Sequence, residues 1–398
     1  MDDAQVEQDL DEMLGESLEM ARQRARLCLA LGDAPLVLYG AGNLGRTVLA
    51  RLRQVGVEPV AFADDTPAKQ GQTIDGLRVM TPQEAVAEVG IHAVFAVTIL
   101  NPLLSFLEAE RRLRQLTKAR VIPFLSIAWS YPERFLPYYQ FELPQHVLPK
   151  AADIRSALHV FADNESRRQF VAHIRFRLWL DYKALPASSK GDYFPPDVLA
   201  PLPSDVTFVD CGAYDGDTVR RFLGQQGGAF GRIYAFEPDE ENCQRLREYV
   251  AAMGDEVARR VHVCQAGVGA RRERLRFNST GNMSAAFDGT GDVEVDVLPL
   301  QEVVEDDGSP LYIKFDVEGA EREALVGADP LIRRARPIIA ISVYHRPDDL
   351  WELPLYLHAL DLGYKLFLRT QGEDGMDVIC YAVQPCQVGS RAVAVKHE

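Results

Sequence analysis

The sequence predicts an α/β protein with two doubly wound domains, joined by a mostly helical connector. Three observations lead to this prediction. The chain has 398 residues, more than one compact core of ordinary size needs. Two stretches alternate short apolar strands with amphipathic helices, which is typical of parallel sheets covered on both faces. Each alternation begins with a strand that runs into a glycine-rich turn, at residues 39–45 and 209–216, so we expect two Rossmann-like domains.

The composition is that of a globular protein and says little about a substrate. Hydrophobic residues make up 47% of the chain and charged residues 25%, and the formal net charge is −15. That charge disfavours nucleic acid and anionic membranes as partners. No apolar run approaches the length of a membrane span, and the first residues lack the features of a signal peptide. We therefore expect a cytoplasmic protein without membrane segments.

Apolar residues recur at helical spacing over residues 5–31, which predicts one amphipathic helix within an N-terminal segment, 1–33. Acids come early in this segment and arginines later, which suits the helix dipole. The apolar face has two interpretations that the sequence leaves open. It packs on its own domain, or it pairs with a second copy of the chain to form a homodimer.

The remaining elements divide the chain into further segments. In the first alternation, apolar runs predict strands at 35–39, 57–64, 93–97 and 120–124, and the first strand leads into a helix at 43–55. Prolines recur in the middle of the chain around one strong helix at 165–183, which indicates a connector that covers part of a neighbouring domain. The predicted domains are 34–130, a connector at 131–203, a second α/β domain at 204–386 and a tail at 387–398.

The first glycine-rich turn has the pattern of a nucleotide-binding turn. Gly40, Gly42 and Gly45 form GxGxxG between an apolar strand and a helix. Glycines let the backbone approach a phosphate, and the helix N-terminus offers free N–H groups. Asp64 and Asp65 end the second strand, where an acid would bind ribose hydroxyls.

The stretch FADDTPAKQGQTIDGLRVMTPQEA, at 62–85, adds a resemblance. Residues 35–125 resemble nucleotide-binding Rossmann domains attached to bacterial sugar-modifying enzymes. The resemblance implies a nucleotide or nucleotide-sugar pocket, for which the candidate residues are Gly40, Gly42, Asn43, Leu44, Gly45, Asp64 and Asp65. The alternatives are a Rossmann fold that has lost its ligand and holds a partner domain, or an NAD-dependent enzyme.

The second glycine-rich turn carries a stronger signal. An apolar strand ends in Asp210, and Gly212 and Gly216 keep the following turn open. The next strand ends in Glu237, which is placed to bind both ribose hydroxyls of an adenosine ligand. No GxxxxGK[ST] lies between these strands, so the sequence does not predict a P-loop.

These residues look like motifs I and II of class I S-adenosylmethionine-dependent methyltransferases. Further along, LYIKFDVEGAE, at 311–321, is similar to the signature of the FkbM-type methyltransferase family. Three other stretches agree with that family: DYFPPDV at 192–198, EALVGADPLI at 323–332 and ISVYHRPDDLWELPLYL at 341–357. The resemblance spans roughly residues 190–385 and implies a class I methyltransferase fold with S-adenosyl-L-methionine as cofactor.

The resemblance also implies a cofactor pocket. The glycine turn would line the methionine end, Glu237 would bind the ribose, and residues of the second and third strand ends would flank adenine. The implied residues are Tyr193, Asp210, Gly212, Ala213, Tyr214, Asp215, Gly216, Asp217, Thr218, Glu237, Pro238, Asn242, Gln265 and Ala266. The loop 281–292 could cover the site through Ser284, but a solvated hairpin is the favoured interpretation.

Three residues are candidates for the catalytic base. Methyl transfer is an in-line displacement, so alignment supplies much of the rate and a base only removes the acceptor's proton. His345 follows the fifth strand and has a suitable ordinary pKa, and Asp316 and Glu318 end the fourth strand. Each has an alternative role, either in hydrogen bonds at the sheet end or in orienting the cofactor amine. Histidine and cysteine spacings predict no metal site.

Together these features predict an S-adenosylmethionine-dependent methyltransferase. The acceptor is expected to be a small molecule with a hydroxyl group: a sugar, a nucleotide-linked sugar or a related metabolite. An alternative is a catalytically silent protein that senses a nucleotide or S-adenosylmethionine, or serves as a scaffold. A second alternative is an NAD-dependent enzyme that uses the first Rossmann-like domain.

Overall fold

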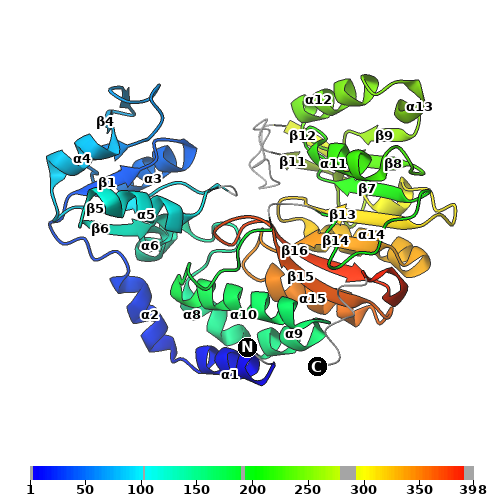
Figure 1. Ribbon diagram of the computed structural model, residues 1–398, viewed down its shortest axis with the longest axis horizontal. Coiled ribbons are helices and arrows are strands. Elements are labelled where there is room, and N and C mark those ends of the chain that lie inside the picture. Colours follow the sequence, from blue (N-terminus) through cyan, green and yellow to red (C-terminus); the bar gives the residue numbers. More distant parts are fainter. Residues whose placement is uncertain (1–2, 102–103, 190–192, 278–292, 390–398) are drawn as a thin grey trace. The chain divides into compact units, whose positions relative to one another are not determined.

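The computed structural model describes residues 3–101, 104–189, 193–277 and 293–389 (Figure 1). The chain forms two compact units. The first comprises Met1–Ala152, Gln169–Lys190 and Thr370–Asp377, and the second comprises Asp153–Arg168, Gly191–Arg369 and Val378–Glu398. Each unit has its own largely parallel sheet with helices around it, so the predicted α/β class with two Rossmann-like sheets is confirmed. Among the described residues, no helix is both long enough and apolar enough to traverse a bilayer.

The N-terminal segment forms two helices, α1 (Asp3–Leu14) and α2 (Leu18–Leu27). The prediction of one helix over residues 5–31 is therefore wrong. Gly15 interrupts the first helix, and the Ser17 Oγ accepts a hydrogen bond from the backbone N–H of Met20 at 3.3 Å, which starts the second. The helical spacing of apolar residues continues from α1 into α2, so the sequence pattern does not reveal the break between them.

The sheet of the first unit has six strands in the order β3-β4-β2-β1-β5-β6. Its neighbours pair in parallel, except that β3 and β4 form an antiparallel hairpin. The strands are β1 (Leu36–Tyr39), β2 (Ala61–Ala63), β3 (Thr73–Ile74), β4 (Leu77–Met80), β5 (Val94–Val97) and β6 (Arg120–Pro123). Consecutive strands are added on one side of β1 and then, from β5, on the other. The edge between β1 and β5 is therefore where such sheets bind ligands.

Helices of the first unit follow the predicted pattern of connections. They are α3 (Asn43–Gln54), α4 (Pro82–Val89), α5 (Phe106–Leu116), α6 (Phe124–Ser130), α7 (Pro132–Phe135) and α8 (Pro144–Val147), with a 3₁₀ turn at Leu148–Lys150. Local sequence explains where several begin. Thr81 and Glu84 form a capping box around Pro82 at the start of α4. Strand β2 is shorter than the predicted 57–64 because Pro59 has no N–H for the ladder.

The main sheet of the second unit has seven strands in the order β15-β16-β14-β13-β7-β8-β9. They are β7 (Thr207–Cys211), β8 (Ile233–Phe236), β9 (Val261–Cys264), β13 (Leu311–Phe315), β14 (Ile338–Ser342), β15 (Lys365–Thr370) and β16 (Val378–Val383). The pairs from β14 to β9 are parallel, and β16 runs antiparallel to β14. The strand order reverses between β7 and β13, which again marks the expected ligand edge.

Helices flank this sheet and carry its connections (Figure 1). They are α9 (Ala151–Val160), α11 (Asp217–Gln226), α12 (Glu240–Ala251), α13 (Asp255–Ala258), α14 (Glu321–Ala335) and α15 (Asp349–Ala359), with 3₁₀ turns at Leu300–Glu302 and Pro385–Gln387. Aromatic rings fill the core under α11, where Phe208 and Phe222 stack with centroids 4.6 Å apart. A three-stranded sheet has the order β10-β12-β11, in which β10 is Gly267–Val268, β11 is Glu273–Phe277 and β12 is Val293–Leu298. The loop with Ser284 lies outside the described residues.

Helix α10 (Asn164–Trp179) contributes to both units, because the division falls between Arg168 and Gln169. Its first turn belongs to the second unit, where it meets a buried arginine. Arg369 donates hydrogen bonds to Asp163 at 2.7 Å, to Asp197 at 2.7 Å and to the Ser166 Oγ at 3.0 Å. The start of α10 is therefore tied to β15 by charged and polar contacts inside the second unit.

Candidate active site

Polar side chains gather where the strands β8, β7, β13 and β14 end. Glu237 follows β8 directly, Asp210 and Gly212 lie at the end of β7, and Asp316 follows β13. His345 comes three residues after β14. Because β7 and β13 are neighbours at the point where strand order reverses, the fold brings these residues to one edge of the sheet.

The turn after β7 passes tightly against the end of β13. Gly212 has a φ of +85°, and a Cβ at this position would lie 1.8 Å from the backbone oxygen of Asp316. The Gly212 and Ala213 N–H groups both donate to the backbone oxygen of Phe236, at 3.0 and 2.9 Å. Only glycine fits here, and its presence leaves the turn lying across the strand ends.

We expect Gly212→Ala to lower the free energy of unfolding by about 3 kcal/mol or more, because the new methyl collides with backbone at a positive φ. Urea denaturation measures the change. Gly224→Ala is the matched control: Gly224 lies on the exposed face of α11 with no atom within 4 Å of its Cβ position. There alanine should add up to about 1 kcal/mol. Equal effects at the two positions would refute the close approach.

Glu237 links this turn to the end of β8. Its Oε2 accepts the N–H of Tyr214 at 2.8 Å, and its Oε1 accepts the N–H of Asp239 at 2.9 Å. The residue is only 6% exposed, and burial raises the pKa of its carboxyl to about 7 against the lowering effect of these hydrogen bonds. The Asn242 side chain makes a further hydrogen bond to this carboxyl group and also lowers its pKa.

A buried lysine joins the cofactor turn to β13. The Lys314 Nζ donates to Asp210 Oδ1 and to the Gly212 backbone oxygen, both at 2.9 Å, and lies 3.6 Å from Asp316 Oδ2. Lys314 and Asp210 are both fully buried. Burial alone would lower the pKa of Lys314, but the charges of Asp210 and Asp316 raise it above its usual value. The Lys314 side chain therefore lies on the same face of the sheet as that of Asp316.

The second oxygen of Asp210 is a notable feature of this pair. Asp210 Oδ2 is buried and has no hydrogen-bond partner among the described residues. Burial raises the pKa of the Asp210 carboxyl to about 6, although the Lys314 ammonium opposes the rise. A buried carboxylate oxygen without a partner is costly, so this atom marks a place where a donor from a ligand would be favourable.

Lys314→Met should destabilise the protein by about 3–5 kcal/mol, because it leaves the buried Asp210 carboxylate without a counter-charge. Thermal unfolding followed by circular dichroism reports the loss. Lys365→Met removes the same group from an exposed position on β15 and should change stability by less than about 0.5 kcal/mol. A Lys314→Met protein as stable as this control would show that the buried pair is not needed for the fold.

Asp316 is oriented by two hydroxyl groups. Its Oδ2 accepts a hydrogen bond from Tyr193 Oη at 2.9 Å, and its Oδ1 accepts one from Ser342 Oγ at 2.8 Å. The Tyr193 ring also lies 5.0 Å from the Lys314 Nζ. Burial raises the pKa of Asp316, but the nearby Lys314 and His345 charges and these hydrogen bonds lower it overall. Asp316 therefore stays ionised and is a weak base.

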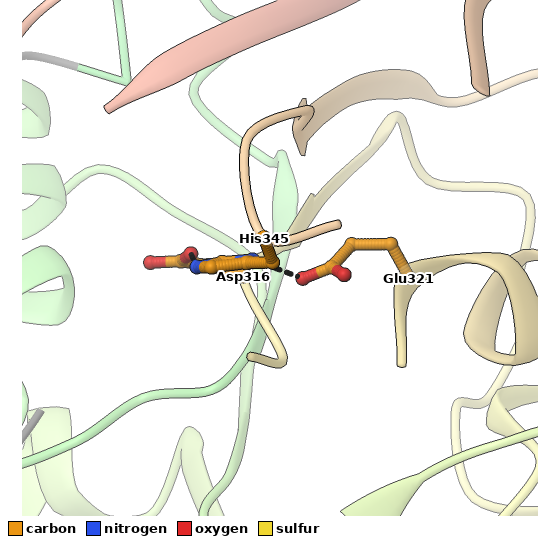
Figure 2. A group of neighbouring side chains, drawn as sticks. All are labelled: Asp316, Glu321 and His345. Atoms are coloured by element: carbon orange, nitrogen blue, oxygen red, sulfur yellow. Dashed lines mark hydrogen bonds and ion pairs between the residues drawn. The ribbon is translucent and has the colours of Figure 1, made fainter. Parts of the chain in front are cut away.

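His345 lies in a row between carboxylates (Figure 2). Its Nδ1 is 2.7 Å from Glu321 Oε1, and its Nε2 is 3.5 Å from Asp316 Oδ1 and 3.7 Å from Glu318 Oε2. The His345 side chain is 1% exposed, whereas those of Asp316 and Glu318 are each 24% exposed. The structure thus brings the three predicted catalytic candidates together, with Glu318 more accessible than His345.

The pKa values of His345 and Glu318 are both raised by their surroundings, for different reasons. Burial lowers the pKa of His345, but the carboxylates around it raise the value to about 10 overall. Burial raises the pKa of Glu318 to about 8, with Asp316 and Glu321 adding to the rise and His345 opposing it. At neutral pH, His345 is therefore an imidazolium, and Glu318 is an unusually basic carboxyl group.

Asp316, Glu321 and His345 also have the composition of a metal-ligand set, with ligand atoms within 4.8 Å of one another. The arrangement does not suit one cation. Glu321 lies beside Nδ1 of the imidazole and Asp316 lies beside Nε2, on opposite sides of the ring (Figure 2). A cation binds at one nitrogen lone pair, so these carboxylates cannot both join it there. The row is better described as a hydrogen-bonded and ionic chain.

The other predicted cofactor residues lie around the same strand ends. Pro238 and Asn242 lie at the end of β8 and in the first turn of α12, and the buried Asn242 Oδ1 has no partner among the described residues. Gln265 is exposed after β9 and accepts hydrogen bonds from Arg247 at 3.3 Å. The remainder belong to the glycine turn, the start of α11 or the end of β9: Ala213, Tyr214, Asp215, Gly216, Asp217, Thr218 and Ala266.

The glycine turn of the first unit is closely packed. A Cβ on Gly45 would lie 1.9 Å from the backbone oxygen of Gly40, and Gly42 has no atom within 4 Å of its Cβ position. Asn43 is exposed and Leu44 half-buried in the first turn of α3. The predicted strand, turn and helix are therefore present at the end of β1.

The two acids that follow β2, Asp64 and Asp65, both accept hydrogen bonds from residues of the first unit. Asp64 accepts the N–H of Ala41 and of Thr66, both at 2.8 Å, and the Lys69 Nζ at 3.0 Å. Burial raises the pKa of Asp64, but these hydrogen bonds lower it overall. Asp65 accepts a hydrogen bond from the Tyr39 hydroxyl. Asp64 thus holds the glycine turn, and its role toward a ribose stays a prediction.

The fold and the strand-end site define an α/β domain with a glycine turn at the sheet edge where such domains bind ligands. Residues 210–366, all within the second unit, match the model of the methyltransferase FkbM domain. The predicted resemblance is confirmed. A search of curated proteins found no match to this chain.

One solved structure agrees in fold over most of the chain, and two others are similar over about half of it. Methyltransferase FkbM from Methylobacillus flagellatus KT is 21% identical, with a TM-score of 0.73 over 93% of this chain and 99% of that one. An rRNA methylase from Streptococcus thermophilus is 15% identical over 48% of this chain and 91% of its own, with a TM-score of 0.30. A SAM-dependent methyltransferase from Aquifex aeolicus is 16% identical over 46% and 84%, with a TM-score of 0.27.

Sequence reasoning did not assign roles to three residues of this site. Lys314, Glu321 and Ser342 contact the predicted residues directly. Lys314 and Asp316 are two positions apart, so strand alternation would have placed them on one face. Glu321 is the first residue of α14, where an acid is ordinarily explained by the helix dipole. Its contact with His345 depends on tertiary structure.

Proposed function

We propose that the protein transfers the methyl group of S-adenosylmethionine to a hydroxyl oxygen of a small polar metabolite, such as a sugar or a nucleotide-linked sugar. The observation that carries this proposal is the row of ionisable groups at the ends of β13 and β14, beside the glycine turn after β7. In it, one accessible carboxyl group, Glu318, has a pKa of about 8. A hydroxyl acceptor must lose a proton as it is methylated, and such a group can receive it.

The residues around the glycine turn fit the cofactor. The unpartnered Asp210 Oδ2 suits an ammonium donor, and Glu237 presents a buried carboxylate to a pair of hydroxyls. Gly212 keeps the strand ends open where a side chain would collide with Asp316. When bound, the cofactor supplies a methyl group activated by a sulfonium. The chain's own residues bind it, orient it and receive the acceptor's proton.

Glu318 is favoured as the catalytic residue among the three candidates. His345 is 1% exposed and protonated at neutral pH, so it neither reaches an acceptor nor accepts its proton. Asp316 accepts hydrogen bonds from Tyr193 and Ser342 and has a lowered pKa, which suits orientation of a ligand. Glu318 is accessible and more basic than an ordinary carboxylate, which favours proton removal.

Calorimetry with S-adenosylhomocysteine and methyl transfer from labelled S-adenosylmethionine test the proposal. The purified chain should bind S-adenosylhomocysteine, and a panel of sugars, nucleotide-sugars and other hydroxylated metabolites should yield a labelled product. A panel of amines and thiols serves as the control. Product only from amines or thiols would contradict O-methylation. Cofactor binding without turnover on any panel or cell extract would favour a silent, cofactor-sensing protein.

For the first unit we propose a nucleotide or nucleotide-sugar site at the turn between β1 and α3. Support comes from the glycine turn at the edge between β1 and β5, where strand order reverses. Titration with UDP, ADP and NAD, followed by amide exchange of residues 40–45, is the experiment. Protection by UDP or ADP supports the site, protection by NAD alone favours the dinucleotide alternative, and no protection contradicts both.

A further inference from the structure

Glu321 makes more contacts in the active-site row than its place at a helix start requires. It is 1% exposed. Its Oε1 accepts the N–H of Val317 at 2.9 Å and lies 2.7 Å from His345 Nδ1, and its Oε2 accepts the N–H of Gly319 at 3.0 Å. One carboxylate therefore binds two segments of the chain, the turn after β13 and the turn after β14.

The turn after β13 carries Glu318 in an uncommon conformation. Glu318 has a φ of +51° and the following Gly319 a φ of +97°. Side-chain-bearing residues rarely adopt a left-handed backbone, and such conformations persist where the surroundings hold them. The two N–H groups that Glu321 accepts belong to the residues on either side of Glu318. Glu321 therefore stabilises the backbone conformation that orients the Glu318 side chain.

The contact between Glu321 and His345 fixes the orientation of the imidazole ring. An ionised carboxylate only accepts hydrogen bonds, so His345 Nδ1 must carry a proton toward Glu321. The Nε2 edge then faces Asp316 (Figure 2), and Nε2 lies 3.7 Å from Glu318 Oε2. A ring turned over, or one without its partner at Nδ1, would no longer present that edge to Glu318.

We propose that Glu321 is the positioning residue for proton transfer, because it holds both the turn that carries Glu318 and the imidazole that lies beside it. This inference rests on the proposed function and deepens it. Glu321 does not contact an acceptor, because its side chain is buried. Its effect on the reaction passes through the backbone of residues 317–319 and through the charge and orientation of His345.

The experiment compares Glu321→Gln with Glu323→Gln. Glu323 lies in the same first turn of α14, and its side chain is 50% exposed, 3.6 Å from Arg346. Both variants lose one negative charge at the helix start, but only the first removes an acceptor from the row. Two readouts need no acceptor molecule: amide exchange over residues 317–319, and the titration of His345 in ¹⁵N-histidine-labelled protein.

In Glu321→Gln we expect amide exchange at Val317 or Gly319 to rise about tenfold, because an amide nitrogen cannot accept their hydrogen bonds. The pKa of His345 should fall by about one unit or more, since an opposite charge beside it is lost. The other charged groups that interact with the ring are Asp316, Glu318 and Asp349. Glu323→Gln should leave both readouts unchanged. Matching results in the two variants would overturn the proposal.

His345→Gln separates the two contacts and protects the test against a Glu321→Gln protein that does not fold. It leaves the bonds from Glu321 to Val317 and Gly319, so amide exchange there should stay within about twofold of the native rate. A rise as large as that expected for Glu321→Gln would show that His345 holds the turn, which overturns the proposal. Exchange and titration are measured without substrate, so they can succeed even if O-methylation is refuted.

Activity provides the third readout, with the acceptor that the panel experiment yields. Glu321→Gln should lower kcat about 100-fold while the KM for S-adenosylmethionine changes less than about threefold, because proton transfer and not cofactor binding is affected. Binding of S-adenosylhomocysteine should be unchanged. A rise in that KM with an unchanged kcat would place Glu321 in cofactor binding and overturn its positioning role.

Discussion

Glu237→Gln should weaken binding of S-adenosylhomocysteine about 100-fold. The carboxylate accepts the N–H groups of Tyr214 and Asp239 at the end of β8, where the ribose site is proposed. An amide of the same shape loses one acceptor oxygen. It therefore leaves a backbone N–H or a ligand hydroxyl without a partner, and each charge-assisted bond contributes about 1.5–3 kcal/mol. Isothermal titration calorimetry measures the change.

Glu241→Gln is the control for this variant. Glu241 is close in sequence, in the first turn of α12, but its side chain is 70% exposed and pairs with Arg245 in the same helix. Its binding constant should match that of the native protein. The pH dependence gives a second check. Burial raises the pKa of Glu237 to about 7, so affinity should rise as pH increases through 7 and then level off. A pH-independent affinity would contradict a carboxylate–ribose contact.

Glu318→Gln should lower the rate of methyl transfer about 100-fold to 10,000-fold and leave binding of S-adenosylhomocysteine intact. The amide cannot accept the acceptor's proton, and a general base contributes a factor of this size. The native rate should rise as pH increases through about 8, where Glu318 ionises, and this limb should be absent from the variant. Initial rates across pH 6–10, with Glu323→Gln as control, make the test.

The same substitution has an effect on stability whose sign follows from the pKa. The folded pKa of Glu318, about 8, lies above the usual value of 4.5. Its contribution to stability is therefore fully present below pH 4.5 and is lost as pH rises through 8. Glu318→Gln removes this loss, so the variant should have a higher Tm than the native protein at pH 9. An unchanged Tm together with an unchanged pH–rate profile would eliminate Glu318 as the base.

The sequence predicted the parts of the fold that depend on local pattern. A short apolar run followed by a glycine-rich turn predicted both β1 and β7. This pattern is local because a buried parallel strand is apolar along its length, and in Rossmann-like sheets the first strand leads into a glycine-rich turn. The break at Gly15 was missed because α1 and α2 share one apolar periodicity. Periodicity reports which face is buried and is silent about where a helix stops and restarts.

In the site, the sequence predicted residues at strand ends and missed those that support them. Asp210, Glu237 and Asp316 follow strands directly, so topology alone brings them to one edge. The state of His345 could not be predicted. Its ordinary pKa suggests a neutral base, but carboxylates from the turn after β13 and from the start of α14 surround it and hold it as an imidazolium. Such shifts depend on distances that only the tertiary structure provides.

Helix α10 has a consequence for any attempt to isolate the methyltransferase domain. The two units are interleaved along the chain, which passes from one to the other at residues 152, 168, 190, 369 and 377. A fragment that starts at residue 204 would lack Asp163, Ser166 and Asp197, which together neutralise and hydrogen-bond the buried Arg369. One proteolytic cut leaves several covalent connections in place. No single cut therefore divides the chain into one fragment for each unit.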